Sequence, residues 1–73
     1  MQEKNIKLYY NRGKKPVMAF TTAYDAAEYL EASKEVDKRY INYIRQNAFY
    51  MCIKGAKISI PCETGRYTLK QEG

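Results

Sequence analysis

The sequence predicts an α+β fold in which two helices pack on a small antiparallel sheet, in the order β-β-α-α-β-β. Short runs rich in β-branched and aromatic residues lie near both ends of the chain, which is typical of strands. Two stretches in the middle carry apolar residues at helical spacing. The 73 residues allow a single small domain over 1–73 with one modest core.

The N-terminal part of the chain predicts a hairpin. Residues 6–10 (IKLYY) are β-prone, and the stretch NRGKK that follows is a turn signal containing Gly13. Residues 16–20 (PVMAF) then form a second short strand, which Pro16 can open or hold at a sheet edge. Residues 1–5 and 70–73 are polar and are expected to fray.

The stretch TTAYDAAEYL predicts the first helix. Thr21 or Thr22 serves as the N-cap, and Asp25 lies near the positive end of the helix. The apolar positions fall at i, i+3, i+4 and i+7, which is one helical face: Ala23, Ala26, Ala27 and Leu30.

The stretch KEVDKRYINYIRQN predicts a second amphipathic helix after a short turn. Ser33 and Asp37 are both candidate caps, and Asn47 can end the helix because asparagine tolerates the left-handed conformation. The apolar face carries Val36, Tyr40, Ile41 and Ile44, and the other side is mostly basic and polar, with Lys34, Lys38, Asn42, Arg45 and Gln46.

The stretch YMCIKGAKISI predicts a second hairpin with Gly55 at its tip. A turn at residues 55–56 pairs Ile53 with Ile58, whereas a turn at residues 54–55 pairs Met51 with Ile58, and both leave the same apolar face. In either register Cys52 and Cys62 point to opposite faces, which argues against a disulfide. A turn at residues 63–65 allows a last strand over residues 66–70.

The composition argues against an enzyme and against a metal site or other cofactor. The chain has no histidine, no paired carboxylates at helical spacing among apolar residues and no glycine-rich phosphate loop. No small-molecule substrate is therefore expected. The sequence shows neither a signal peptide nor an apolar run long enough to span a membrane, so we expect a cytoplasmic protein with reduced thiols.

The net charge of +5 and a pI near 9.3 point to a polyanionic partner. Two helices joined by a short turn are similar to a helix-turn-helix, whose second helix reads the major groove. Lys54 and Lys57 beside the hairpin tip would then hold the phosphate backbone, as in a winged helix. Two alternatives stay open: the helix face is only solvated, and the hairpin lysines only protect a sheet edge.

The run TAYDAAEYL (Thr22 to Leu30), followed by a basic helix and then FYMCIKGAKISI, resembles the excisionases of phages and conjugative transposons. It is also similar to the small helix-turn-helix modules attached to homing endonucleases. The resemblance implies DNA-reading positions on the second helix and a hairpin wing; those positions, with Lys34 added from the helix face, are Lys34, Lys38, Arg39, Asn42, Arg45, Gln46, Lys54 and Lys57. Departures are Asp25 or Ala26 where the family usually has Glu, and a longer segment between the helices.

We therefore expect a small sequence-directed DNA-binding protein, architectural or regulatory, from a phage or mobile element, with double-stranded DNA as its partner. The alternative is a phage-type inhibitor that binds a host or phage protein, such as an anti-CRISPR or host-takeover protein, because eight tyrosines exceed what so small a core can bury. A third reading is a dimerisation module that pairs through a sheet edge.

Overall fold

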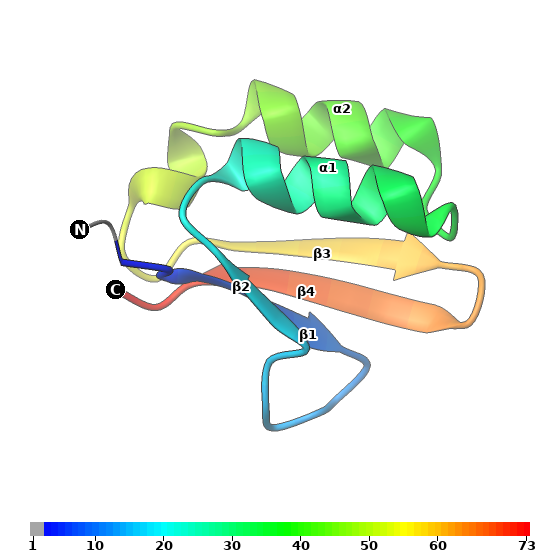
Figure 1. Ribbon diagram of the computed structural model, residues 1–73, viewed down its shortest axis with the longest axis horizontal. Coiled ribbons are helices and arrows are strands. Elements are labelled where there is room, and N and C mark those ends of the chain that lie inside the picture. Colours follow the sequence, from blue (N-terminus) through cyan, green and yellow to red (C-terminus); the bar gives the residue numbers. More distant parts are fainter. Residues whose placement is uncertain (1–2) are drawn as a thin grey trace.

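The predicted fold class is confirmed: two helices cover one face of a four-stranded antiparallel sheet (Figure 1). The computed structural model describes residues 3–73. Its elements are β1 (Ile6–Tyr10), β2 (Met18–Phe20), α1 (Ala23–Ser33), α2 (Lys38–Gln46), a 3-10 turn η1 (Tyr50–Cys52), β3 (Lys57–Cys62) and β4 (Gly65–Gln71). The strand order is β2-β1-β4-β3, so β1 and β4 form the centre of the sheet.

The predicted N-terminal hairpin is confirmed, with Ile6 opposite Phe20 and Leu8 opposite Met18. Its second strand begins at Met18 rather than at Pro16. The predicted last strand also exists, and it pairs with β1 as well as with β3. Because β4 reaches Gln71, two of the four C-terminal residues expected to fray belong to the sheet. The N–H of Glu72 donates to the carbonyl of Asn5, which extends this pairing beyond the strands.

Helix α1 begins after the N-cap residue Thr22 and ends at the C-cap residue Lys34. The Oγ1 atom of Thr22 accepts a hydrogen bond from the N–H of Asp25 at 3.2 Å, so Thr22 is the N-cap. Lys34 ends the helix in the left-handed conformation, with φ 59°. The predicted apolar face is fully buried: Ala23, Ala26, Ala27 and Leu30. Three alanines on that face let α1 approach its neighbours closely.

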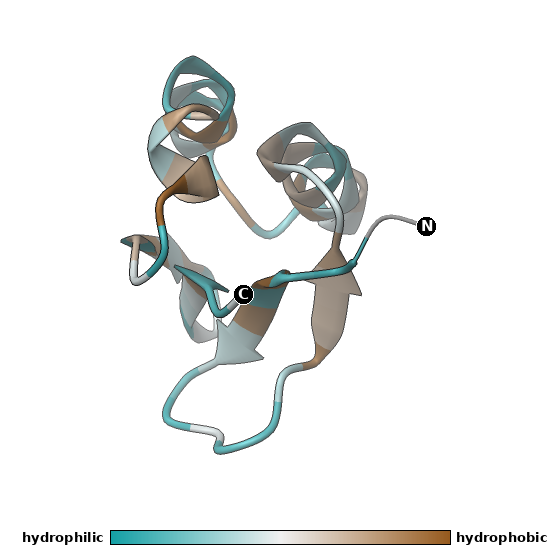
Figure 2. Cartoon of the chain, turned by 90° about the vertical axis from the view of Figure 1, so that its left-hand side faces the viewer, coloured by the Kyte–Doolittle hydropathy of each residue, from teal (hydrophilic) through white to brown (hydrophobic). Residues whose placement is uncertain are grey.

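Helix α2 is capped by Asp37, whose Oδ1 accepts from the N–H of Arg39 at 2.9 Å, and Asn47 ends the helix with φ −109°, not in the left-handed conformation. Only residues 34–37 separate the two helices, so the predicted short turn is confirmed. The helices lie side by side (Figures 1 and 2) and run in opposite directions (Figure 1). This is an αα-hairpin rather than the steep crossing of a helix-turn-helix.

The predicted hairpin with Gly55 at its tip is wrong. Residues 50–52 form a 3-10 turn in which Met51 alone is buried, and Ile53 is 60% exposed. β3 pairs instead with β4, which places Ile58 opposite Leu69 and Ile60 opposite Tyr67. Gly55, with φ 89°, lies in the turn between η1 and β3.

The core lies between the sheet and the two helices. Alternate residues of the three long strands face the helices and are buried there, among them Ile6, Leu8, Ile58, Ile60, Tyr67 and Leu69. Ile41 and Ile44 of α2 complete this layer, and Val36 and Tyr40 pack at its margin. Both cysteines are free thiols; Cys52 is exposed and Cys62 is half-buried. The opposite face of the sheet is left uncovered by the helices.

Candidate functional site

The cations predicted on the helix face are partly neutralised by acidic neighbours. Arg45 Nη2 lies 3.3 Å from Glu31 Oε1 on α1. Arg39 Nε lies 4.0 Å from Asp37 Oδ1, and its guanidinium lies 5.0 Å from the ring centre of Tyr40. The remaining predicted residues of this region, Lys34, Lys38, Asn42 and Gln46, are exposed.

The two lysines predicted at a hairpin tip lie in the edge strand β3 and in the turn just before it. Lys57 is exposed and precedes the buried Ile58, so its side chain points to the face of the sheet that the helices leave open. Lys54 lies in the exposed turn before β3. The hairpin wing predicted around Gly55 does not form, but Lys57 and Ser59 of the edge strand β3 line a hollow of about 430 Å³ together with Arg39, Tyr40 and Tyr43 of α2.

Positive charge is concentrated away from the helices. Residues 21–49, which contain both helices, carry four Lys and Arg against five Asp and Glu. The rest of the chain carries nine Lys and Arg against three Glu. The whole excess of +5 therefore belongs to the sheet and its loops. Long-range attraction of a polyanion would be directed to that side.

The register of the sheet aligns three lysines in one row across its open face. Lys7 of β1 lies opposite Lys70 of β4, and Lys70 lies opposite Lys57 of β3. Residues directly opposite in antiparallel strands share a face and have neighbouring Cβ atoms. Strands are spaced by about 4.8 Å, so the row extends over about 10 Å. We call Lys7, Lys57 and Lys70 the lysine row.

Polar side chains occupy the next positions of the open face. Tyr9, Thr68 and Ser59 form a second row beside the lysine row. Arg66 follows on β4, and its Nη1 donates to Ser59 Oγ at 2.7 Å. The face therefore combines cations with hydroxyl groups, the side chains that proteins use to contact phosphate oxygens.

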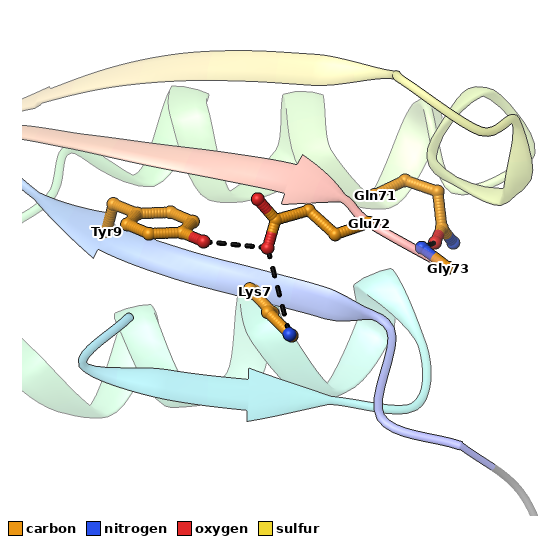
Figure 3. A network of polar contacts seen from close by, with 5 residues as sticks. All are labelled: Lys7, Tyr9, Gln71, Glu72 and Gly73. Carbon is orange, nitrogen blue, oxygen red and sulfur yellow. Dashed lines mark hydrogen bonds and ion pairs between the residues drawn. The ribbon is translucent and has the colours of Figure 1, made fainter. Parts of the chain in front are cut away.

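One carboxylate reaches this face. Tyr9 donates its hydroxyl hydrogen to Glu72 Oε2 at 2.7 Å, and Lys7 Nζ lies 3.8 Å from the same oxygen (Figure 3). The hydrogen bond to Glu72 raises the pKa of Tyr9 above its ordinary value of 10.0, with burial as a smaller cause. Lys70 Nζ lies 5.0 Å from the ring centre of Tyr9, a cation–π contact. Lys57 has no ion-pair partner among residues 3–73.

A basic loop extends the open face. The β1–β2 loop carries Arg12, Lys14 and Lys15, all exposed, and it lies at the end of the molecule opposite the helices (Figures 1 and 2). Arg12, Asn11 and Arg66 line a hollow of about 510 Å³. Asn11 Oδ1 accepts from the N–H of Arg66 at 3.0 Å, which fixes the base of the loop to β4.

Within residues 3–73, no three His, Cys, Asp or Glu side chains gather as metal ligands. In the same part of the chain, no helix combines the length and the apolar character needed to cross a membrane. The hydroxyl group of Tyr67 donates a hydrogen bond to Glu35 Oε2 at 3.1 Å. Burial, and then this hydrogen bond, raises the pKa of Tyr67 to about 12.

Comparison with protein-family models, curated proteins and solved structures finds no match to the chain. The resemblance to excisionases and homing-endonuclease modules therefore stays a prediction. Of the residues on the open face of the sheet, only Lys57 was predicted from the sequence as a site residue.

Proposed function

We propose that this protein binds double-stranded DNA through the open face of its sheet, as a small architectural or regulatory DNA-binding protein. The observation that carries the proposal is the lysine row, three cations placed opposite one another on neighbouring strands. α2 is not the principal contact in this proposal, because Arg39 and Arg45 lie beside carboxylates.

The lysine row carries an electrostatic cost that a phosphate backbone would relieve. Like charges directly opposite on paired strands destabilise a sheet. Among the residues that the structure describes, Lys7 is the one member of the row within 4.0 Å of a carboxylate oxygen, that of Glu72 at 3.8 Å. Phosphates beside the row would replace repulsion with attraction and would release counterions from the DNA, which is the main source of sequence-independent affinity.

The shape of the face favours a duplex over a single strand. The row crosses three strands over about 10 Å, comparable to the width of the major groove of B-DNA, about 12 Å, so its two ends could contact the phosphate backbones on either side of that groove. Proteins that hold single strands stack bases on aromatic rings. Tyr9 is the aromatic residue of the open face; Lys70 lies over its ring and Glu72 holds its hydroxyl group. It is therefore not free to stack on a base.

Fluorescence anisotropy of a labelled duplex of random sequence tests this proposal. If four phosphates are contacted, the affinity falls about 100-fold between roughly 50 and 200 mM salt. A labelled single strand of equal length should bind more weakly than the duplex. Unchanged anisotropy with the duplex at the lower salt concentration would reject DNA binding.

A second candidate function, a phage-type inhibitor that binds a protein, is favoured by exposed rings on the helical side. Tyr24, Tyr43 and Phe49 are each at least half exposed. Aromatic residues are enriched in protein interfaces. The same titration separates the candidates, because an inhibitor that acts only on a protein leaves the anisotropy of free duplex unchanged.

A further inference from the structure

An apolar patch lies at one end of the helical layer, away from the open face of the sheet. Phe49 is 89% exposed, Ile53 60%, Tyr24 57% and Tyr50 45%. We call these four residues the Phe49 patch. The exposed parts of these side chains lie outside the core, to which this segment of the chain contributes the fully buried Met51.

Two residues of the patch, Tyr24 and Phe49, line a hollow of about 150 Å³. It is lined by Thr21, Thr22, Ala23, Tyr24, Ala48, Phe49 and Cys52, none of them charged. An apolar cavity of about 150 Å³ is large enough to admit benzene. The patch thus presents a projecting phenyl ring directly beside a hollow that fits such a ring.

We propose that the Phe49 patch is the contact between two copies of this chain, related by a two-fold axis. In a two-fold contact the same patch meets itself, so every feature must find its complement on the same surface. The ring of Phe49 and the adjacent hollow satisfy this requirement, because each copy inserts its ring into the hollow of the other.

Area favours a second copy as the occupant. Because each copy carries +5, a contact between copies must lie away from the basic face, and the hollow has no charged lining residue. The four exposed side chains offer roughly 500 Å² per copy, so a dimer would bury about 1,000 Å² in all. That is the lower limit for a specific interface, and we expect a dimer that dissociates on dilution. Both open faces would stay free in it.

Sedimentation equilibrium of the full chain, from about 10 μM to about 1 mM, tests the dimer. The weight-average mass should rise with concentration from 8.6 kDa toward twice that value. Phe49→Ser should hold the mass at that of the monomer over the whole range. Its thermal midpoint should match that of the original chain, because the side chain is almost fully exposed.

Tyr43→Ser is the matched control, since Tyr43 is 51% exposed and does not line the hollow. This variant should dimerise as the original chain does. A chain that stays monomeric at about 1 mM would overturn the proposal. Association that persists in Phe49→Ser would also overturn it, because the contact would then lie on another surface, such as a sheet edge. Neither outcome bears on DNA binding, which is measured separately.

Discussion

At the scale of single residues, the lysine row is expected to lower the stability of the fold and to provide the proposed contact with DNA. Lys57 and Lys70 are directly opposite and carry the same charge, although either could be neutral or acidic without disturbing the core behind them. The side chain of Lys57 is exposed and makes no ion pair within residues 3–73. We therefore expect Lys57 to increase the affinity for DNA rather than the stability of the fold.

Lys57→Glu should make the protein more stable and a poorer DNA binder. The substitution turns a like-charge pair with Lys70 into an opposite-charge pair, which is worth about 0.2–1 kcal/mol on one face of a sheet. Urea denaturation should show a higher midpoint, and anisotropy should show affinity for duplex reduced at least tenfold. A variant that is less stable and binds normally would contradict this role for Lys57.

Tyr67 should make stability fall at high pH. Its pKa is raised from 10.0 to about 12 in the folded protein, chiefly by burial and then by Glu35. Between pH 10 and 12 the unfolded chain has lost this proton while the folded chain keeps it. The stabilising contribution is therefore complete below pH 10 and is lost as the pH rises through about 12.

Tyr67→Phe should lower stability at neutral pH, where the bond to Glu35 is lost, and should flatten the decline between pH 10 and 12. Urea midpoints across that range measure both effects. Tyr43→Phe, which alters an exposed ring, should keep the slope of the original chain. An equal decline in Tyr67→Phe would show that other groups cause it.

At the scale of elements, local sequence predicted most of the structure. Both helices and the N-terminal hairpin follow from spacing, and each observed N-cap, Thr22 and Asp37, is one of the two candidates that capping chemistry left open. The prediction of a hairpin at Gly55 failed because the alternation of apolar residues before Gly55 fits a strand as well as it fits the 3-10 turn that forms there. Met51 is buried in a 3-10 turn, and Gln71 donates its side-chain N–H to the Met51 carbonyl at 3.1 Å. That contact joins residues distant in sequence, so no local pattern reveals it.

The N-cap of α1 offers a test at this scale. Thr22→Ala removes the acceptor for the N–H of Asp25 and should cost about 1 kcal/mol of unfolding free energy. Thr22→Ser keeps a hydroxyl oxygen at the cap and should restore most of that loss. Urea denaturation of the three proteins measures it. An alanine variant as stable as the original would show that the cap contributes little here.

At the scale of the whole molecule, the candidate site is produced by topology. Lys7 and Lys70 become neighbours only because β4 enters the centre of the sheet beside β1, which joins the two ends of the chain. The sequence predicted the basic charge and Lys57, but it assigned that lysine to a wing that does not form. A row across strands depends on strand order and register, and neither was fixed by periodicity alone.

The most direct test of the central claim compares two double variants that each remove two positive charges. Lys57→Ala with Lys70→Ala alters the lysine row, and Lys38→Ala with Arg45→Ala alters the helix face. We predict that the first pair weakens duplex binding at least tenfold at about 100 mM salt, whereas the second changes it less than threefold. The reverse order of effects would place the DNA contact on α2 and would contradict the account given for the open face of the sheet.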